Sequence, residues 1–188
     1  MRITGGLYRG RTIQCPPGII RPAMDRMRES LFSILGDIAG CSFLDLFSGS
    51  GCVGIEAASR GAEPVHLVEM DRGKKPVIRK NIGFVESQIK LFMTNVNHFI
   101  PTAKIQYDFV YADPPFPMSG KVALAQSIDR ANLVKNEGLF IIHYPAEEQN
   151  GWPQQIGELV FLDERTYGRS LLRFYRRENA AHPEPVQK

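Results

Sequence analysis

Short apolar segments alternate with segments of helical periodicity through the middle of the chain. Five near-continuous apolar segments predict buried strands at residues 43–47, 64–69, 89–93, 107–112 and 138–144. Three segments between these strands have the pattern of helices, at 51–60, 72–86 and 119–135. Apolar strands separated by helices are typical of a parallel sheet that is covered on both faces. The pattern therefore predicts an α/β fold with a doubly wound sheet.

Two strand-like segments complete this pattern, at residues 158–164 and 170–177. Only a short turn separates them, so they must pair antiparallel. We therefore expect a mostly parallel sheet that is closed by an antiparallel C-terminal hairpin. Residues 178–188 contain few apolar side chains, and we expect them to form a frayed polar tail.

The N-terminal part shows two further patterns. Residues 1–20 contain two short strand-like runs around glycines and end near the turn CPPG, which predicts a small β-hairpin. Apolar residues at helical spacing follow, and they predict an amphipathic helix that begins between Pro22 and Asp25. The expected organisation is an N-terminal hairpin extension at 1–20, one main domain at 21–177 and the tail.

The composition is that of one ordinary soluble domain. The chain has 188 residues, of which 43% are apolar and 23% charged, and no apolar run is long enough to span a membrane. The N-terminus lacks the apolar segment of a signal peptide, so we expect a cytoplasmic protein without membrane contact. Three cysteines and four histidines show no metal-ligand spacing, and we expect reduced thiols and no metal. Nothing in the pattern indicates more than a monomer.

Positive charge is concentrated at one end of the chain. The net charge is only +3, but residues 1–30 contain six arginines and two acidic residues. A solvated charged face is the ordinary explanation of such a run. Here, however, every cation is an arginine, whose planar guanidinium suits phosphates and base edges, and an aromatic residue lies among them. The pattern predicts RNA or another polyanion as partner, bound through Arg2, Tyr8, Arg9, Arg11, Arg21 and Arg26.

A glycine-rich loop follows the first predicted strand. Gly49, Gly51 and Gly54 form the pattern G-x-G-x-x-G between a strand and a helix. Glu69 lies at the end of the second strand, where its carboxylate can accept hydrogen bonds from both hydroxyls of a ribose. A tight turn without a ligand would explain the glycines but not the acidic residue. The loop therefore predicts a cofactor that contains a nucleoside.

Two cofactors meet this description, NAD(P) and S-adenosylmethionine. Asp45 lies on the first strand, just before the loop. Its carboxylate would repel the pyrophosphate of NAD(P), but it suits a cofactor that carries an ammonium group and a sulfonium cation. The charge of Asp45 therefore favours S-adenosylmethionine, the methyl donor.

The motif DPPF, residues 113–116, follows the fourth predicted strand. Asp113 then lies at the carboxyl end of that strand, where open sheets of this type bind ligands. Pro114 and Pro115 have no N–H, so the motif offers hydrogen-bond acceptors on a stiff backbone. A strand-ending turn that happens to hold two prolines is the alternative interpretation. An acceptor-only site recognises a donor, and the exocyclic amino group of a nucleobase is suitable.

Such a site can prepare the amino group for methylation. If the Asp113 carboxylate and the Pro114 carbonyl each accept one N–H, the nitrogen lone pair can point at the methyl group. The bond to the carboxylate is the stronger one, at about 1.5–3 kcal/mol. Phe116 offers a flat face on which the base can stack. We expect direct in-line transfer without an obligatory general base, and Asp113 can receive the released proton.

Several motifs together resemble one family. DPPF downstream of DLFSGSG is similar to the amino methyltransferases that use S-adenosylmethionine. GGLYRGR, RPAMDRMRESLF, LDLFSGSGCVGIEAASRGA, VEMDR, RKNI and YGRSLLRFYRR resemble the RsmD family over residues 1 to about 177. This resemblance implies a class I, Rossmann-like methyltransferase domain at 21–177. It also implies methylation of the N2 amino group of one guanine in bacterial 16S rRNA, of the guanine966-N2 type, with 16S rRNA or a small-subunit assembly particle as partner.

The resemblance also implies roles for individual residues. Asp113 to Phe116 would hold the guanine amino group, and the N-terminal hairpin would contact RNA. Ala23 and Met24 stand where the family more often has Thr or Ser. Asn95 stands where many methyltransferases have Asp, and its carbonyl can still accept a bond from the adenine amino group. The expected cofactor site consists of Asp45, Phe47, Gly49, Ser50, Gly51, Glu69, Met70, Asn95, Val96 and Asp113.

Other functions stay open from the sequence. DPPF does not distinguish one exocyclic amine from another, so an amino methyltransferase on adenine N6 of DNA or another RNA is the nearest alternative. A dehydrogenase would need NAD(P) in the glycine loop, and an inactive RNA-binding module would not need Asp113. Cys52 is not expected to act as a nucleophile, because it lies in the cofactor loop and not near the fourth strand.

Overall fold

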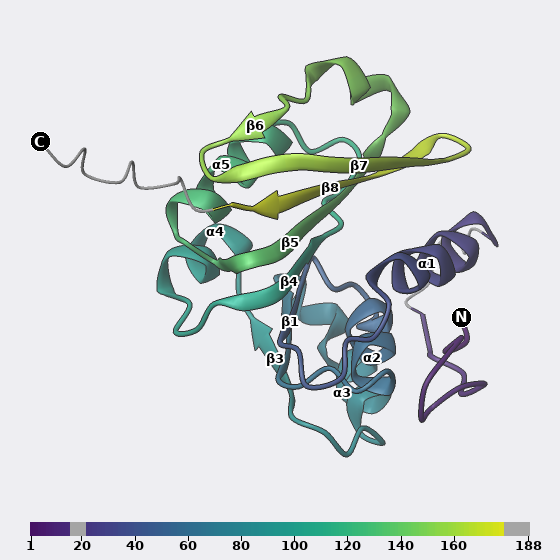
Figure 1. Ribbon diagram of the computed structural model, residues 1–188. Coiled ribbons are helices and arrows are strands. Elements are labelled where there is room, and N and C mark those ends of the chain that lie inside the picture. The colour runs from purple at the N-terminus through teal and green to yellow at the C-terminus, as the bar shows by residue number, and fades with distance from the viewer. Residues whose placement is uncertain (16–21, 179–188) are drawn as a thin grey trace, which may run out of the picture.

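Five parallel strands form the centre of the structure, a computed structural model that describes residues 1–15 and 22–178 (Figure 1). They are β1 (Phe43–Leu46), β2 (Val65–Glu69), β3 (Ile89–Met93), β4 (Tyr107–Ala112) and β5 (Val134–Pro145). Three antiparallel strands extend the sheet beyond β5, namely β8 (Ser170–Arg177), β7 (Leu159–Tyr167) and β6 (Gln155–Ile156). The complete order is β3-β2-β1-β4-β5-β8-β7-β6, which confirms the predicted α/β class with a mostly parallel sheet and an antiparallel C-terminal hairpin.

Helices cover both faces of the sheet (Figure 1). One face carries α1 (Pro22–Leu35), α2 (Cys52–Ser59), the short η1 (Arg72–Lys74) and α3 (Lys75–Ile82). The other face carries α4 (Val96–Phe99), η2 (Ile100–Thr102) and α5 (Lys121–Arg130), while η3 (Ala146–Gly151) follows β5. Each face of the sheet packs against its helices in a separate hydrophobic core, and the side chains of β1 alternate between these two cores. Phe43 packs in the core formed with α1 and α2, whereas Leu44 and Leu46 pack in the core formed with α4 and α5. None of the helices in the described ranges is long and apolar enough to cross a membrane.

The strand order changes direction at β1. β1 pairs in parallel with β2 on one side and with β4 on the other, so that Asp45 lies between Leu67 and Tyr111. The chain therefore leaves β1 and β4 toward opposite faces of the sheet. Open α/β sheets bind ligands in the crevice at such a point. The predicted glycine loop and DPPF segment are the two loops that border it.

The N-terminal segment folds back on itself without forming regular strands. Residues 1–15 contain one antiparallel bridge, Arg2 with Thr12, flanked by backbone bonds from Ile3 N–H to Arg11 O and from Ile13 N–H to Met1 O, and residues 16–20 of the predicted hairpin lie outside the described part. The backbone N–H groups of Thr4 and Gly5 donate to the buried carboxylate of Glu56 on α2. Glu56 therefore holds this segment to α2 through its side chain. Burial alone would raise the pKa of Glu56, but bonds from Thr4, Arg60 and Arg28 outweigh it, and the pKa is lowered.

Several element boundaries also differ from the expected ones. The predicted helix at 72–86 is split into η1 and α3 and ends at Ile82, with Gly83 as the C-cap in a right-handed conformation. The predicted helix at 119–135 is α5, which ends at Arg130, and Asn132 then takes a positive φ of 53°. Val134 already belongs to β5, so this strand starts earlier than expected. The sequence pattern did not predict the short elements α4 and β6.

Candidate active site

The loop between β1 and α2 is shaped by left-handed residues. Gly49 and Gly51 have φ angles of 59° and 79°, and Phe47, which is not a glycine, has a φ of 62°. The N–H of Gly51 donates to Ser48 O at 2.7 Å and closes the turn. Further on, a Cβ at Gly54 would lie 2.2 Å from Leu67 Cδ2, so only glycine lets α2 pack this closely on β2. These glycines shape the loop and its packing on β2, and the predicted contact of the loop with a cofactor stays a prediction.

Glu69 organises the end of β2. Its carboxylate accepts the N–H of Gly49 and that of Asp71, each at 2.9 Å, and forms an ion pair with Lys74 at 3.3 Å. The predicted role of Glu69 was to accept ribose hydroxyls. In the structure it also holds the glycine loop and η1 in place.

Asp45 is a buried carboxylate at the bottom of the site, with 1% of its surface exposed. Its Oδ2 accepts the N–H of Gly54 at 3.0 Å. Burial raises the pKa of Asp45 well above its ordinary value; the Gly54 bond opposes this shift, and the nearby Asp113 and Glu69 carboxylates add to it. The carboxyl ends of β1, β2 and β4 therefore form a region of negative potential, which favours a cationic ligand and disfavours a pyrophosphate.

The DPPF segment leaves β4 beside the glycine loop. The N–H of Asp113 donates to Leu46 O at 3.2 Å, which joins this segment to the end of β1. The carbonyl of Pro115 accepts the N–H of Met118 at 2.8 Å and closes a turn. The carbonyl of Pro114 has no hydrogen-bond partner among the described residues. The segment therefore presents two acceptors, this carbonyl and the Asp113 carboxylate.

His143 is a site residue that the sequence analysis missed. It lies near the end of β5 and is buried, and its Nδ1 is 2.7 Å from Asp113 Oδ1. Because an ionised carboxylate only accepts, Nδ1 carries the hydrogen, and the ring fixes the orientation of Asp113. Phe116 packs edge-on against the same ring, with 5.2 Å between centroids. The available signal was the position of His143 at the carboxyl end of a predicted strand next to β4.

Lys121 is a second residue that was missed. It is the first residue of α5, after Gly120, and only 2% of it is exposed. Its Nζ donates to the carbonyls of Phe116 and Met118, at 2.9 and 2.7 Å, and pairs with Glu148 at 2.7 Å. Lys121 thus holds the DPPF turn in place through charged hydrogen bonds to its backbone carbonyls, and such bonds are stronger than neutral ones. A lysine in a helix-start pattern gave no sequence signal for this role.

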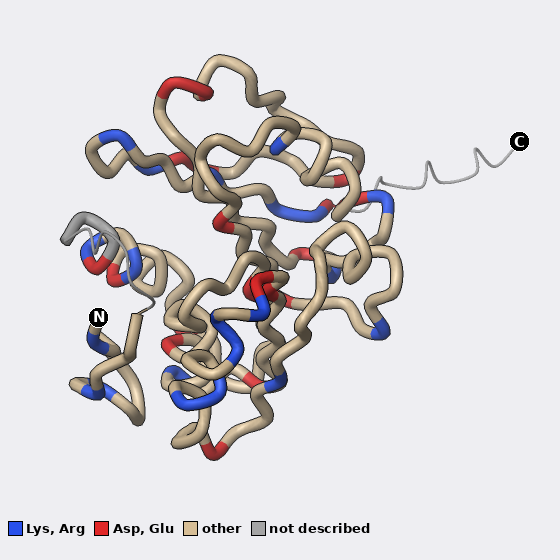
Figure 2. The backbone as a smooth tube through the Cα atoms, turned by 180° about the vertical axis from the view of Figure 1, so that it is seen from behind, with Lys and Arg blue, Asp and Glu red and all other residues tan. Residues whose placement is uncertain are grey.

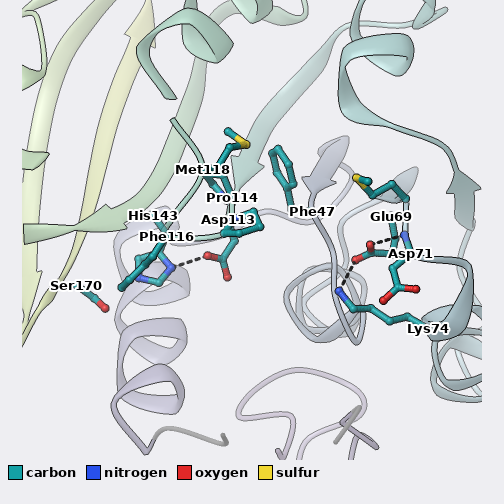
Figure 3. A pocket seen from close by; sticks show the side chains of 12 residues that line it. Phe47, Glu69, Asp71, Lys74, Asp113, Pro114, Phe116, Met118, His143 and Ser170 are labelled. Atoms are coloured by element: carbon teal, nitrogen blue, oxygen red, sulfur yellow. Dashed lines mark hydrogen bonds and ion pairs between the residues drawn. The ribbon is translucent and has the colours of Figure 1, made fainter. Parts of the chain in front are cut away.

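A cavity of about 620 Å³ lies between these loops (Figure 3). Among the residues predicted to form the site, its wall contains Phe47, Glu69, Met70, Asp113, Pro114, Pro115 and Phe116. The wall also contains five residues that were not predicted: Asp71, Lys74, Met118, His143 and Ser170. In Figure 3 the Asp113–His143 pair and the Glu69–Lys74 pair lie on opposite sides of Phe47. No three His, Cys, Asp or Glu side chains in the described ranges are grouped so as to hold a metal ion.

Other predicted cofactor residues lie outside this wall. Asp45, Gly49, Ser50 and Gly51 form the loop and strand beneath it. Asn95 caps α4, since its Oδ1 accepts the N–H of Asn97 at 2.8 Å, and its Nδ2 lies 3.9 Å from the sulfur of Met70. The following residue, Val96, is buried. Asn95 is therefore connected to the cavity through Met70, and its predicted contact with an adenine stays a prediction.

The predicted RNA-binding residues do not all reach the surface. Arg2, Arg9, Arg11 and Arg26 are exposed, whereas Arg21 lies outside the described residues, as do the side chains of Ala23 and Met24. Tyr8 is only 5% exposed and packs edge-on against Phe84, so it belongs to a small core and is not available to stack on a base. Arg28, counted in the basic run, is also buried and pairs with Glu56.

The order of the parallel strands, the glycine loop after β1 and the acidic end of β2 define the Rossmann-like fold of class I methyltransferases. The family model "Conserved hypothetical protein 95" matches residues 1–176. "Ribosomal RNA small subunit methyltransferase D" of Escherichia coli K12 is 33% identical over 186 residues, which cover 95% of this chain and 90% of that protein. The chain therefore belongs to this family, the RsmD family.

Two further relatives agree with this assignment. "Putative rRNA methyltransferase YlbH" of Bacillus subtilis is 30% identical over 186 residues, covering 94% of this chain and 99% of that protein. The solved structure "Putative methyltransferase yhhF from Escherichia coli" has a TM-score of 0.86 and 31% identity, covering 96% of this chain and 99% of that one.

The raised pKa of Asp45 predicts an unusual stability profile. We expect Asp45→Asn to raise the free energy of unfolding at pH 7, on the order of 1 kcal/mol, because a buried charge without a cation is replaced by a neutral group. A group whose pKa is raised in the folded state destabilises it as pH rises above the unfolded-state value of about 3.9. The difference in the free energy of unfolding between the variant and the wild type, measured by urea titration, should therefore increase from pH 4 upward.

Asp108 provides a control in which the pKa shift, and therefore the expected change in stability, has the opposite sign. Its partial burial would raise its pKa, but bonds from Lys135 and Ser42 outweigh this effect and lower the pKa. Asp108→Asn should therefore reduce the free energy of unfolding at pH 7, and the loss should disappear as pH falls through the lowered pKa. A stability difference for Asp45→Asn that does not change between pH 4 and 8 would contradict the assignment.

Lys121 generates a prediction about loop mobility. Lys121→Met keeps the apolar stem but removes both bonds to the DPPF turn, each worth about 1.5–3 kcal/mol as a charged hydrogen bond. Amide exchange in residues 116–120 should accelerate about tenfold or more, measured by mass spectrometry. Lys135→Met, which removes an exposed ion pair with Asp108, is the matched control and should leave this segment unchanged. Equal exchange in both variants would show that Lys121 does not hold the turn.

Proposed function

We propose that the protein transfers a methyl group from S-adenosylmethionine to the exocyclic N2 amino group of one guanine in bacterial 16S rRNA, of the guanine966-N2 type. One observation carries the proposal: the acceptor-only pair of Asp113 carboxylate and Pro114 carbonyl lies beside an acidic cofactor site at the switch point of the sheet. Family membership supports it, because the Escherichia coli relative is named for methylation of small-subunit ribosomal RNA.

The donor set around the cavity fits a cationic cofactor. The Asp113 and Glu69 carboxylates are close enough to raise the pKa of Asp45, and Lys74, which pairs with Glu69, is the one Lys or Arg among the side chains that line the cavity. S-adenosylmethionine supplies an electrophilic methyl group next to a sulfonium. Asp45 and the glycine loop would hold its charged amino-acid part, and Glu69 its ribose.

The DPPF segment would orient the amino group of the target base. Asp113 and Pro114 each accept one N–H, which turns the nitrogen lone pair away from the wall and toward the cofactor side. Phe116, on the cavity wall, offers its ring as a stacking platform. Lys121 fixes this segment by its two carbonyl bonds. Positioning of this kind can supply several kcal/mol, about 7–11 at the limit, without any general base.

The proton balance involves Asp113 and His143. The new N–C bond would form as the S–CH3 bond of the donor breaks, which leaves neutral S-adenosylhomocysteine and a positively charged nitrogen. The extra proton of that nitrogen would leave to the Asp113 carboxylate or to water. His143 donates its Nδ1–H to Asp113 throughout and so keeps one carboxylate oxygen facing the base. We therefore assign His143 as a positioning residue.

RNA would approach from the side of the N-terminal segment. Arg2, Arg9, Arg11 and Arg26 are exposed there and can pair with phosphates. We propose that the protein works as a monomer in the cytoplasm, on 16S rRNA or on a small-subunit assembly particle. The Asp113 carboxylate and the Pro114 carbonyl would select an amino group, and the exposed arginines would select the RNA molecule that carries it.

Incubation with labelled S-adenosylmethionine tests the proposal. Deproteinised 16S rRNA, assembled small subunits and DNA are offered separately, and labelled products are digested to nucleosides. We expect N2-methylguanosine from one of the two ribosomal substrates. Asp113→Ala should reduce kcat at least about 100-fold, since a donor-orienting group is lost at the reacting nitrogen.

Other outcomes of this experiment contradict the proposal. Label confined to adenine N6, or to DNA, would replace it with the alternative amino methyltransferase. Wild-type activity of Asp113→Ala would show that the acceptor pair does not orient the reacting amine. Asp37→Asn, an exposed carboxylate substitution remote from the cavity wall, serves as the control and should keep full activity.

A further inference from the structure

A second group of basic residues lies beside the N-terminal segment. Residues 71–80, which form η1 and most of α3, contain five Lys or Arg and one Asp. Figure 2 shows them as a nearly continuous blue stretch that leads from the strand ends along α3. Arg72, Arg79 and Lys80 are exposed, and Lys75 is partly exposed. The sequence analysis counted this charge only in the net total.

Four of these five basic side chains have no acidic partner among the described residues, and Lys74 alone pairs with Glu69. The C-terminal half pairs most of its basic side chains with Asp or Glu: Lys121, Lys135, Arg165, Arg169, Arg173, Arg176 and Arg177. By contrast, Arg72, Lys75, Arg79 and Lys80 form no ion pair with any acidic residue in the ranges 1–15 and 22–178. Their charge is therefore uncompensated and is available to a polyanion.

The basic stretch joins the N-terminal segment at one end. The Asn81 side chain, at the end of α3, bonds to the backbone N–H and carbonyl of Gln14, at 3.0 and 2.8 Å. The guanidinium of Arg11 lies 4.6 Å from the ring centroid of Phe84, just beyond α3. Arg11 is therefore adjacent to the C-terminal end of α3, and Figures 1 and 2 both show the two segments side by side.

The same stretch reaches the cavity at its other end. Asp71 and Lys74, which belong to the same ten residues, line the cavity wall. α3 has eight residues, so it is about 12 Å long, the length of a few nucleotides of backbone. Positive charge thus runs on the exposed side from Arg11 along α3 to η1, and it reaches the cavity at the wall that Lys74 and Glu69 form, across Phe47 from Asp113.

We propose that this basic track, defined as Arg11, Arg72, Lys75, Arg79 and Lys80, binds the phosphates of the RNA strand that carries the target base and leads it to the cavity. This inference rests on the proposed function, because it takes RNA as the substrate. RNA is favoured over an anionic membrane because the track ends at a cavity whose acceptor pair suits a base. Phosphate contacts position a strand without reading its sequence. The basic track therefore determines the affinity for RNA, and the cavity determines which chemical group of the RNA reacts.

A matched pair of double variants tests the track. Arg79→Ala with Lys80→Ala removes two exposed cations from the last turn of α3. Lys104→Ala with Arg130→Ala removes two exposed cations from the opposite face, and Arg130 also lies in the last turn of its helix. The two proteins have the same net charge. Binding to deproteinised 16S rRNA is measured by filter binding at several salt concentrations, together with S-adenosylmethionine affinity by calorimetry.

We expect the α3 double variant to lose about tenfold in RNA affinity near 0.15 M salt. The slope of log K against log salt should fall by about 1.4 in magnitude, since each lost single-strand phosphate contact contributes about 0.7. KM for RNA should rise while kcat at saturating RNA and the S-adenosylmethionine affinity stay unchanged. The control double variant should stay within about twofold of wild type in all of these measurements.

If the two double variants have equal RNA affinity and an equal slope of log K against log salt, the proposal that the basic track binds RNA is wrong. Methylation of the same rRNA by the wild-type protein is measured in parallel. If the wild type methylates the rRNA but the two double variants bind it equally, the basic track is wrong and the proposed function is still supported. Binding of wild type to phosphatidylserine vesicles that depends on Arg79 and Lys80, with RNA affinity unaffected, would assign the surface to a membrane and would also overturn the proposal.

Discussion

Parallel pairing of β1 with β2 on one side and β4 on the other is the constraint on which the site depends. Because the three strands run in the same direction, their carboxyl ends meet at one edge and bring together Asp45, Glu69 and Asp113 from distant parts of the sequence. The connections from β1 and β4 go to opposite faces, so a crevice opens between the glycine loop and the DPPF segment. The glycine loop and the DPPF segment are adjacent for this topological reason, and the antiparallel strands beyond β5 contribute one cavity residue, Ser170.

Clustering carboxylates at this edge has a cost for folding that the ligand can offset. Burial raises the pKa of Asp45, and the neighbouring carboxylates raise it further. Cation binding would relieve this repulsion, so stability and cofactor binding are coupled through one side chain. Buried polar side chains hold the surrounding loops: Lys121 holds the DPPF turn, and Glu56 holds the N-terminal segment. Asn81 bonds both to Gln14 and to Ser50 O of the glycine loop, so its side chain connects the N-terminal segment with that loop.

Periodicity and local motifs were enough to predict the sheet, its doubly wound order and the loops of the crevice, because these depend on apolar spacing, glycines and prolines. The contacts that need tertiary structure were not predictable. His143 bonds to Asp113, 30 residues away, and only its position at the end of a predicted strand indicated this contact. Lys121 bonds to the carbonyls of the nearby turn, and nothing in the sequence indicated that role. Tyr8 was interpreted as a stacking residue because of its arginine neighbours, but its ring is in a small core with Phe84. The basic run of η1 and α3 was visible in the sequence, but the absence of acidic partners for four of its cations is a feature of the described tertiary structure.

Calorimetric titration of the protein with S-adenosylmethionine and with NADH, in the same buffer, tests the central claim most directly. Strand-end carboxylates would select a cationic cofactor and repel a pyrophosphate. We therefore expect saturable one-to-one binding of S-adenosylmethionine, weakened by Asp45→Asn, and no measurable binding of NADH. Tight NADH binding without S-adenosylmethionine binding would contradict this expectation.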